Sequence, residues 1–356
     1  MSAVVAARPA AAPAGEAQRS GFLSERIVHV HPTRLCNLAC RHCYSHSSPR
    51  QRGELAAALI LGGFALLRRE GYTQVSLSGG EPLVYRELLA LIDGARVLGL
   101  RVTMVSNGLL VDARAEAALS RLHGLAISFD GLARTHNAVR GRDDAYARAC
   151  GALRYQASRG RPTAAAISLA RDALSELPDL VDELLDCGAR AFQIRPVARA
   201  GRAKGLPGRC FYSDADQARL VLVINALRQE LPGVPIHCDL VPARSLWRQR
   251  ADYSGLLASS AASAPLPLAE LVNPLVITDD STLKPIAYDF ASRFDIATLH
   301  TLDDDATQRY KRGRLNDLRA LVQDALSGLA DRNGFVDWFD HCTRMSELQT
   351  PVCQGV

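Results

Sequence analysis

The sequence has few of the features that mark membrane proteins or nucleic-acid-binding proteins. No apolar run in its 356 residues is long enough to span a bilayer. The formal charge is only +5, and no Lys/Arg block or interleaved aromatic platform indicates a nucleic-acid surface. Residues 1–20, rich in Ala and Pro, lack the apolar core of a secretory signal and are expected to form a flexible tail. These absences predict a soluble, cytoplasmic protein with no membrane or nucleic-acid partner.

Paired cysteines of the kind that bind structural zinc are also scarce. Zinc sites usually take four ligands from two C-x2-C-like pairs, and no such pair follows Cys43. The chain has instead one compact group, Cys36, Cys40 and Cys43, spaced C-x3-C-x2-C. Three thiolates on one loop can ligate three irons of a [4Fe–4S] cluster and leave the fourth iron open to a small molecule. The spacing favours a cluster, although His42 or His46 could complete a Cys3His zinc site.

A second motif, Gly79-Gly80-Glu81-Pro82, directly follows the short apolar stretch Gln74–Ser78. Two glycines let a backbone turn tightly and approach a ligand closely. Exposed amides and carbonyls at such a strand end can hold an amino-acid-like group. Taken alone, this motif is more often a simple turn, but together with the three cysteines it is specific.

The two motifs together resemble the radical S-adenosylmethionine (SAM) superfamily. The resemblance covers residues 26–200 and continues through Val102–Gly108, Leu125–Gly131 and His136–Gly141. Within this superfamily, the chain most resembles the branch of peptide maturases that carry a SPASM or shorter twitch extension. That family implies a [4Fe–4S] cluster on the three cysteines and SAM as the second cofactor.

Alternating strand and helix patterns support the same fold without the family name. The strand candidates are Arg26–His31, Gln74–Ser78, Arg101–Ser106, Leu125–Phe129, Thr163–Leu169 and Ala191–Ile194. The helix candidates between them are Leu55–Glu70, Arg86–Leu98, Asp112–Leu122, Ala145–Arg159 and Leu174–Cys187. Such alternation predicts a parallel α/β sheet, here a partial (β/α)6 TIM-like barrel over residues 21–205. Sites in these folds gather at the carboxyl ends of strands, where every motif above falls.

The resemblance also implies roles in SAM binding. The Gly79–Pro82 backbone would hold the methionine amino group, and Ser106 and Asn107 could line the ribose side. Ser128, at the end of a strand, would bond the ribose or the carboxylate. The position before the third cysteine is commonly aromatic in the family and packs on adenine; here it is His42, whose flat ring could do the same.

Three further residues are assigned in the same way. Arg140 would pair with the SAM carboxylate, since a guanidinium fork binds a carboxylate in bidentate fashion. Gln193 and Arg195 would face the adenine or the substrate. For Arg140, Ser128 and Gln193 the alternative is an ordinary polar residue at a turn or strand end. No residue is assigned to catalysis.

Residues 206–356 are predicted to form an α+β extension made of a degenerate SPASM/twitch-like hairpin and helices. Asn273–Ile286 resembles the hairpin, with a polar turn at Asp279–Ser281. Ile286 stands where the family usually has cysteine, which favours a hairpin kept as a scaffold after its auxiliary cluster was lost. The alternative is a residual cluster on the remaining cysteines of this region: Cys210, Cys238, Cys342 and Cys353. The helical stretches expected here are Ala306–Arg312, Leu315–Leu329 and a short segment around Phe335–Arg344.

The resemblance implies a radical SAM enzyme reduced by a flavodoxin or ferredoxin. The reduced cluster would cleave SAM, and the 5′-deoxyadenosyl radical would abstract hydrogen from a ribosomally synthesised precursor peptide, leading to crosslinking, epimerisation or a related change. A small-molecule substrate such as a sugar, nucleoside or amino acid is the alternative, and a non-catalytic zinc scaffold is a remote one. Candidates for quenching the radical are Tyr288 and the four cysteines of the extension.

Overall fold

The structure is a computed structural model that describes residues 25–250, 256–257 and 266–348. The tail predicted over residues 1–20 and the candidate Cys353 lie outside the described residues.

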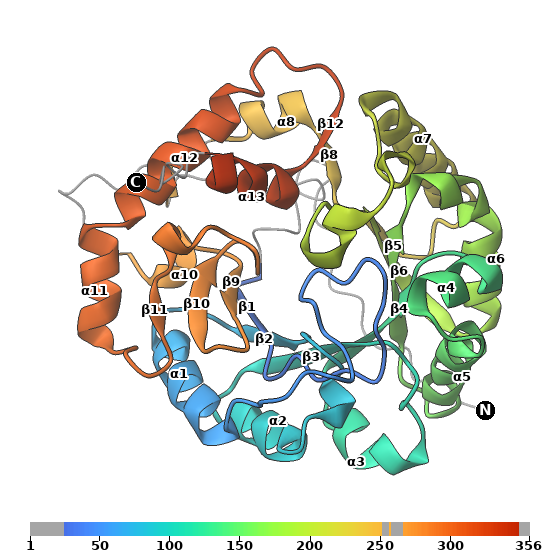
Figure 1. The fold of residues 1–356 in the computed structure, drawn as a ribbon, viewed down its shortest axis with the longest axis horizontal. Coiled ribbons are helices and arrows are strands. Elements are labelled where there is room, and N and C mark those ends of the chain that lie inside the picture. The colour runs from blue at the N-terminus through green and yellow to red at the C-terminus, as the bar shows by residue number, and fades with distance from the viewer. Residues whose placement is uncertain (1–24, 251–255, 258–265, 349–356) are drawn as a thin grey trace.

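The centre of the molecule is a curved sheet whose parallel strands follow the order of the chain (Figure 1). Its parallel strands are β1 (Ile27–Val30), β2 (Gln74–Leu77), β3 (Arg101–Ser106), β4 (Gly124–Phe129), β5 (Thr163–Leu169), β6 (Ala189–Pro196) and β7 (Ile236–Cys238). Each pairs with the next in parallel register. The predicted α/β class and the six strand–helix repeats are confirmed, and β7 adds a seventh strand.

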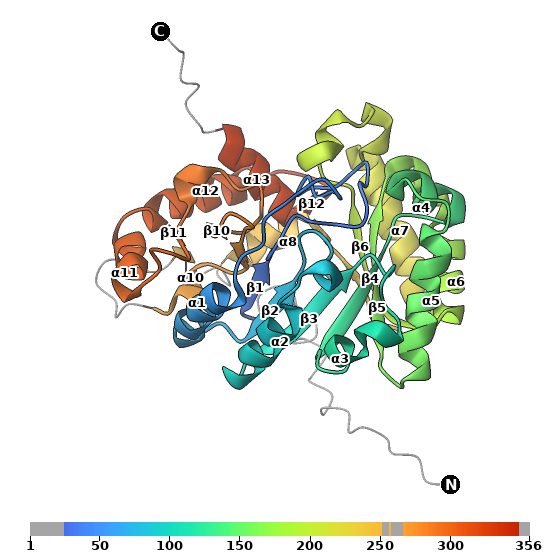
Figure 2. The same ribbon diagram turned by 60° about the horizontal axis from the view of Figure 1, so that its bottom comes forward.

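Helices cover the outer face of this sheet (Figures 1 and 2). The α-helices of the barrel are α1 (Ala57–Arg69), α2 (Leu88–Val97), α3 (Glu116–Leu119), α4 (Ala133–Arg140), α5 (Ala145–Ser158), α6 (Leu177–Asp186) and α7 (Asp214–Glu230). Short 3-10 helices are η1 (Pro82–Val84), η2 (Ala113–Ala115), η3 (Arg171–Glu176), η4 (Gly201–Gly205) and η5 (Gly208–Cys210). The apolar pattern does not predict α4, because the residues that this helix buries are His136 and Arg140.

The two faces of the strands are chemically distinct. Along β5, buried Ala165, Ile167 and Leu169 alternate with half-buried Ala164 and Ala166. Since side chains alternate between the faces of a strand, the buried set packs under the helices and the half-buried set faces the barrel interior. The same alternation along β4 and β6 leaves an interior that is partly accessible at the carboxyl ends of the strands.

The C-terminal extension continues the sheet of the barrel. Its strands are β8 (Leu240–Pro242), β9 (Leu275–Ile277), β10 (Thr282–Pro285), β11 (Ala297–Thr298) and β12 (Phe335–Asp337), and its helices are α8 (Ala243–Arg248), α10 (Leu268–Leu271), η7 (Ser292–Phe294), α11 (Asp304–Arg312), α12 (Leu315–Ser327) and α13 (Trp338–Leu348). Strands β9 and β10 form the expected antiparallel hairpin. Strand β9 also pairs in parallel with β1, which the sequence did not predict.

One expectation for the extension is wrong. The segment around Phe335–Arg344 is not helical throughout, because Phe335, Val336 and Asp337 form β12, which pairs antiparallel with β8. Helix α13 begins only at Trp338. The backbone of these three residues thus finds its hydrogen-bond partners in a distant strand, a contact that local sequence patterns do not reveal.

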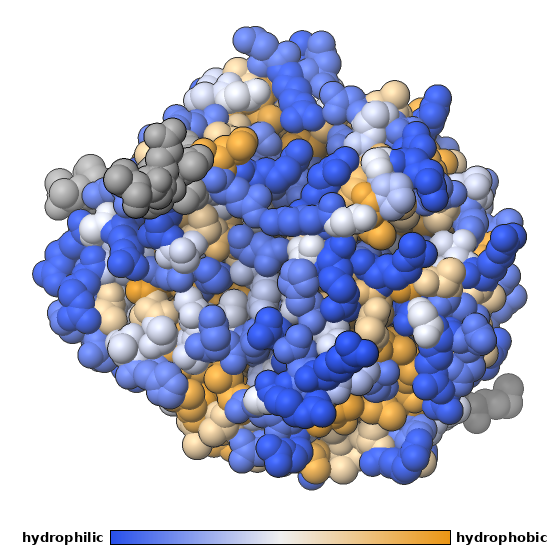
Figure 3. Space-filling view, viewed as in Figure 1, coloured by the Kyte–Doolittle hydropathy of each residue, from blue (hydrophilic) through white to orange (hydrophobic). Residues whose placement is uncertain are grey.

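The described residues contain no helix that is both long and apolar enough to cross a bilayer. Hydrophilic residues cover most of the face seen in Figure 3, with hydrophobic residues scattered toward its lower rim.

Candidate functional site

The three cysteines lie on the loop that follows β1 and crosses the front of the barrel in Figure 1. Cys36 and Cys40 are buried, Cys43 is half-buried, and all three are free thiols. They pack with Leu38, Leu109 and Ala145 in a small apolar cluster separate from the main core. The fold therefore brings the three thiols into one environment, as their spacing predicts.

A single zinc ion and a cubane cluster make different demands on the three thiols. Sulfur ligands of one zinc ion lie about 3.8 Å apart, because each Zn–S bond is about 2.3 Å. Among the residues that the structure describes, no three His, Cys, Asp or Glu side chains converge on one such point. A cubane instead takes one thiolate at each of three separate iron corners. His42 is also engaged elsewhere, since its Nε2 lies 2.6 Å from an oxygen of Asp130.

Burial and charge act on the thiols in opposite directions. Burial raises the pKa of the Cys36 thiol to about 12 and raises that of Cys40. The guanidinium groups of Arg140 and Arg202 act the other way on Cys40 and lower its pKa. Because a metal-bound cysteine must lose its proton, these two cations favour the ligating form.

The turn after β2 is fastened to the cysteine loop by its backbone. The N–H of Gly80 donates to the carbonyl of Thr33 at 2.9 Å, and the N–H of Glu81 donates to that of Leu35 at 3.0 Å. A Cβ atom on Gly80 would lie 1.9 Å from the Leu35 carbonyl oxygen, so only glycine permits this approach. Gly79 has φ +100, a region that also favours glycine. The amides of Gly80 and Glu81 thus position the cysteine loop, and holding the methionine amino group stays a prediction for this turn.

Glu81 connects the turn to the end of β3. Its buried carboxylate accepts hydrogen bonds from the Ser106 hydroxyl at 2.9 Å, from the Asn107 N–H at 2.8 Å and from the Leu83 N–H at 3.2 Å. The last of these caps η1, which Pro82 begins. Burial raises the pKa of Glu81, whereas these donors lower it. The side chain of Glu81 therefore orders the site, a role that the sequence did not suggest.

Asn107 connects the hydrogen bonds around Glu81 to the cysteine loop. Its Nδ2 donates to Oδ1 of Asn37 at 2.7 Å and lies 3.9 Å from Sγ of Cys36. Ser106 is turned to Glu81 and accepts the Gly108 N–H at 3.1 Å. Both side chains are brought to the site as expected, while their contact with a ribose stays a prediction.

Asp130, just after β4, binds two side chains that the sequence assigned to SAM. Arg140 donates to its carboxylate through Nε and Nη2, at 2.5 and 3.1 Å, and His42 contacts the same carboxylate. The Arg140 fork is thus bidentate on a protein carboxylate, not held free for a ligand. Its pairing with the SAM carboxylate and the packing of His42 on adenine stay predictions; what the structure shows is a link between the cysteine loop and β4.

Ser128, Gln193 and Arg195 face the barrel interior. Ser128, Ala166, Gln193 and His237 lie side by side in register across β4, β5, β6 and β7. Small side chains therefore line the β4–β5 part of the wall, and polar ones line the β6–β7 part. These positions suit a ligand contact, which remains a prediction for each of the three.

Two aspartates lie at the polar β6–β7 part of the barrel wall, and the sequence patterns did not assign either of them to a site. Asp239 is buried, with Gln193 Nε2 at 3.4 Å and Arg195 Nε at 3.2 Å. Burial, and then the nearby Asp239 carboxylate, raise the pKa of the Asp337 carboxyl to about 7. Asp239 could have been suspected from its place one residue beyond a short strand. Asp337 arrives from β12, and no local pattern would have placed it there.

The aromatic side chain of Tyr288, from the extension, reaches the cysteine loop. The ring of His31 stacks on Tyr288 at a centroid distance of 4.7 Å, and its Nε2 lies 3.2 Å from the hydroxyl of Tyr44. Burial lowers the pKa of His31 to about 3, so this imidazole is neutral near pH 7. Tyr288, a predicted radical-quenching candidate, thus lies beside the cluster loop.

The other described cysteines lie apart from the cysteine loop. Cys150 and Cys187 are buried on the helical layer, as expected for small apolar residues. Cys238 and Cys342 are buried in the main core, and Cys210 is half-buried in η5. Ile286 packs against the same core, so an apolar side chain fills the position where the family usually has cysteine. The absence of an auxiliary cluster stays a prediction.

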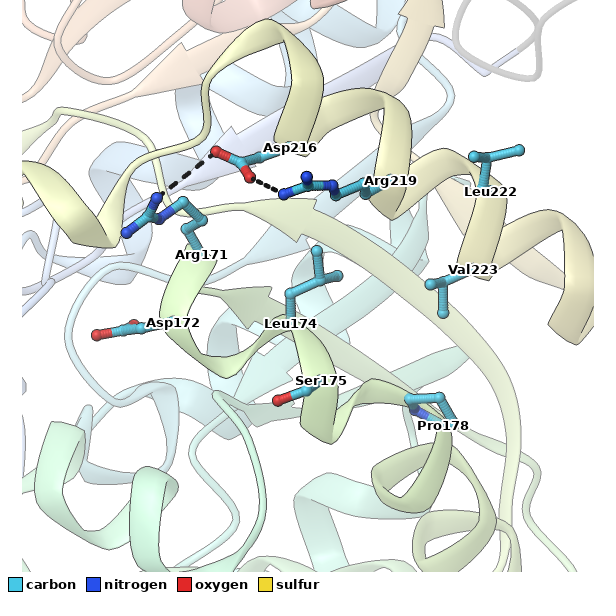
Figure 4. A pocket seen from close by; sticks show the side chains of 9 residues that line it. All are labelled: Arg171, Asp172, Leu174, Ser175, Pro178, Asp216, Arg219, Leu222 and Val223. Carbon is cyan, nitrogen blue, oxygen red and sulfur yellow. Dashed lines mark hydrogen bonds and ion pairs between the residues drawn. The ribbon is translucent and has the colours of Figure 1, made fainter.

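A groove of about 660 Å³ lies on the outer side, between η3 and α7 (Figure 4). Leu174, Pro178 and Val223 are among its apolar lining residues, and the lining Asp216 is paired with Arg171 at 3.9 Å and Arg219 at 3.2 Å. None of the cysteines lines it. We therefore do not assign it to the cluster site.

Comparison with known proteins agrees with this site. The Radical SAM superfamily model matches residues 30–191, which include the three cysteines, the Gly-Gly-Glu turn and strands β2 to β5. Residues 30–191 are a radical SAM domain. Enzymes of this superfamily use a [4Fe–4S] cluster and SAM, so the cofactors predicted from the motifs are confirmed at the level of the family.

Curated relatives differ in what they are named for. The chain is 33% identical over 196 residues to pre-heme d1 synthase of Dinoroseobacter shibae, covering 54% of this chain and 48% of that protein. It is 27% identical over 173 residues to the sporulation killing factor maturation protein SkfB of Bacillus subtilis, covering 48% and 42%. The chain thus spans about half the length of the curated relatives that it matches.

Solved structures show the same fold over most of the chain. Streptococcus suis SuiB bound to SAM has a TM-score of 0.62 at 16% identity, covering 86% of this chain and 71% of SuiB. The enzyme anSMEcpe with bound AdoMet has a TM-score of 0.63 at 14% identity, covering 89% and 84%. At this identity the likeness establishes the fold alone, and it includes the extension.

Replacing Gly80 with alanine should disrupt the contact between the turn and the cysteine loop. The added Cβ meets a backbone carbonyl, which cannot move aside as a side chain could. We expect a loss of about 1–3 kcal/mol in the free energy of unfolding and a clear loss of bound iron. Gly62→Ala is the matched control, because Gly62 lies within α1 with nothing within 4 Å of the added Cβ. Urea unfolding and iron analysis measure both effects, and equal behaviour of the two variants would contradict the assignment.

Asp337→Asn should change how stability depends on pH. The pKa of Asp337 is about 7 in the fold against 3.8 for the ordinary group, so the folded chain holds this proton more tightly between those values. Stability is therefore lost as the pH rises from about 4 to about 7. The variant lacks this loss, so its advantage over the wild type should widen from about pH 4 and reach roughly 3–4 kcal/mol above pH 7. Unfolding curves across this range test it, with exposed Asp331→Asn as the control; parallel profiles for wild type and Asp337→Asn would refute it.

Proposed function

We propose that this chain is a radical SAM enzyme that reductively cleaves SAM and abstracts hydrogen from a ribosomally synthesised precursor peptide. The observation that carries the first part is the backbone contact between the cysteine loop and the Gly-Gly-Glu turn at the carboxyl ends of β1 and β2. This contact brings the loop that carries the three thiols against the close-approach turn, which supports a shared site for cluster and SAM.

Cys36, Cys40 and Cys43 would hold the [4Fe–4S] cluster. When bound, the cluster supplies the electron that breaks the sulfonium C–S bond of SAM and yields the 5′-deoxyadenosyl radical. The chain's own residues hold the ligands: the Gly79–Pro82 turn would bind the methionine amino group, while Ser128 and Gln193 would contact SAM or the substrate from the barrel wall. A flavodoxin or ferredoxin would be the electron donor.

Support for a peptide substrate comes from the extension and from the barrel wall. The chain shares its fold, extension included, with SuiB, which has been solved with the precursor peptide SuiA. Gln193, Arg195, Asp239 and Asp337 form a wall of hydrogen-bonding groups beside the small residues of β4 and β5. Amide, guanidinium and carboxylate groups are suitable partners for a peptide backbone and its side chains.

A small-molecule substrate is the second candidate, because the chain is 33% identical to a relative named pre-heme d1 synthase. The polar wall would then bind the polar substituents of that molecule.

Cys40→Ala should abolish release of 5′-deoxyadenosine from SAM under dithionite. One iron corner loses its ligand, so the cluster is lost or cannot act. The wild-type chain should hold about four irons, the complement of one cubane. Cys150→Ala is the matched control, because Cys150 is a buried apolar residue of α5, outside the cluster loop, and it should retain full release. Unchanged release by Cys40→Ala would remove this site from the mechanism, and eight or more irons would refute the loss of auxiliary clusters.

The substrate is tested by coexpressing the chain with short reading frames encoded beside it. Mass spectrometry and chiral amino-acid analysis of each peptide should show a change that requires intact Cys40. A loss of two hydrogens indicates crosslinking or desaturation. An unchanged mass with new D-residues indicates epimerisation. No modification of any such peptide, with SAM cleavage intact, would overturn the peptide proposal and favour the small molecule.

A further inference from the structure

We propose that Arg202 is a positioning residue for the iron–sulfur cluster: its guanidinium fixes the backbone of the cysteine loop and places a positive charge beside the cluster that favours reduction. No sequence pattern singles out this residue, which lies in η4, beyond β6.

Arg202 binds the cysteine loop at three points. Its Nε donates to the carbonyl oxygen of Cys40 at 2.8 Å, and its Nη2 donates to that of Ser47, also at 2.8 Å. Its backbone N–H donates to the carbonyl oxygen of Cys43 at 2.9 Å. Two of the three cluster cysteines thus have their carbonyls held by one residue, whose planar fork is suited to bridging two acceptors.

The residue before it makes this approach possible. Gly201 has φ +52, and a Cβ atom there would lie 2.1 Å from the carbonyl oxygen of Tyr44 and 2.4 Å from that of Cys43. Only glycine allows η4 to lie this close to the loop. The Gly201 N–H donates to Oδ2 of Asp289 at 3.2 Å, so the segment after the C-terminal hairpin holds η4 in place.

The charge of Arg202 is not neutralised by the bonds that hold it. Those bonds end on uncharged carbonyl oxygens. The other cation at this site, Arg140, is paired with the Asp130 carboxylate at 2.5 Å. A cluster on three thiolates is anionic and becomes more so when it accepts an electron from a low-potential donor. A nearby uncompensated cation stabilises the reduced form more than the oxidised form.

The test compares Arg202→Gln, Arg202→Lys and the control Lys204→Gln. Lys204 supplies a cation from the same short helix, but its ammonium is paired with Glu347 at 2.9 Å. Two readouts are used, and neither depends on substrate. The first is the alkylation rate of Cys40 and Cys43 in the metal-free chain, and the second is the fraction of reduced cluster at a fixed poised potential, measured by EPR.

In both Arg202 variants, Cys40 and Cys43 should be alkylated several-fold faster than in the wild type. Neither glutamine nor the single ammonium of lysine can bridge the two carbonyls, so the cysteine loop is held less firmly. Arg202→Gln should lower the ratio of reduced to oxidised cluster about threefold or more, and Arg202→Lys should keep most of that ratio because the charge remains. Lys204→Gln should match the wild type in both readouts.

Thermal unfolding of each metal-free variant shows whether the fold is kept. Alkylation at the wild-type rate in a folded Arg202→Gln chain would overturn the positioning role. An unchanged reduced fraction in Arg202→Gln, or an equal loss in Arg202→Lys, would overturn the role of the charge. If Arg202→Gln binds no iron, the alkylation rates of the metal-free chains test the positioning role. The reduced fraction in Arg202→Lys then tests the role of the charge.

Discussion

The site depends on two backbone hydrogen bonds that join the turn after β2 to the cysteine loop after β1. The amides of Gly80 and Glu81 donate to the carbonyls of Thr33 and Leu35, and the absence of a side chain at Gly80 is what lets the segments meet. Long loops have many conformations, and ordering one costs conformational entropy. Here the loop is ordered against an adjacent parallel strand end, so three thiols that are close in sequence also become close in space.

Buried carboxylates extend this order to the neighbouring strands. Glu81 binds the end of β3, and Asp130, after β4, binds His42 on the loop and Arg140 on α4. A buried carboxylate is costly unless donors surround it, and each of these two has several. The result is a loop attached to three consecutive strand ends. Arg202 and the extension attach it from the opposite side.

The extension completes the site and does not stand apart from it. Strand β9 pairs with β1 at one edge of the barrel, and β12 pairs with β8 near the other. Through these pairings Tyr288 reaches His31, and Asp337 reaches the wall that holds Arg195 and Asp239. Residues far apart in the chain thereby share the interior, which the described part of the chain leaves open at the strand ends.

The sequence by itself determined the grouping of three cysteines on one loop, the order of the strands and the edge at which the candidate site lies. These follow from local rules: cysteine spacing on one loop, glycine where a turn must be tight, and alternation that implies parallel strands whose carboxyl ends share an edge. Only the tertiary structure decided what the polar side chains do. Arg140 and His42 bind Asp130, Glu81 binds the end of β3, and Arg202 binds the cysteine loop. Each of these hydrogen bonds depends on a partner from a different segment of the fold. Such pairings are set by three-dimensional packing, and no local pattern records them.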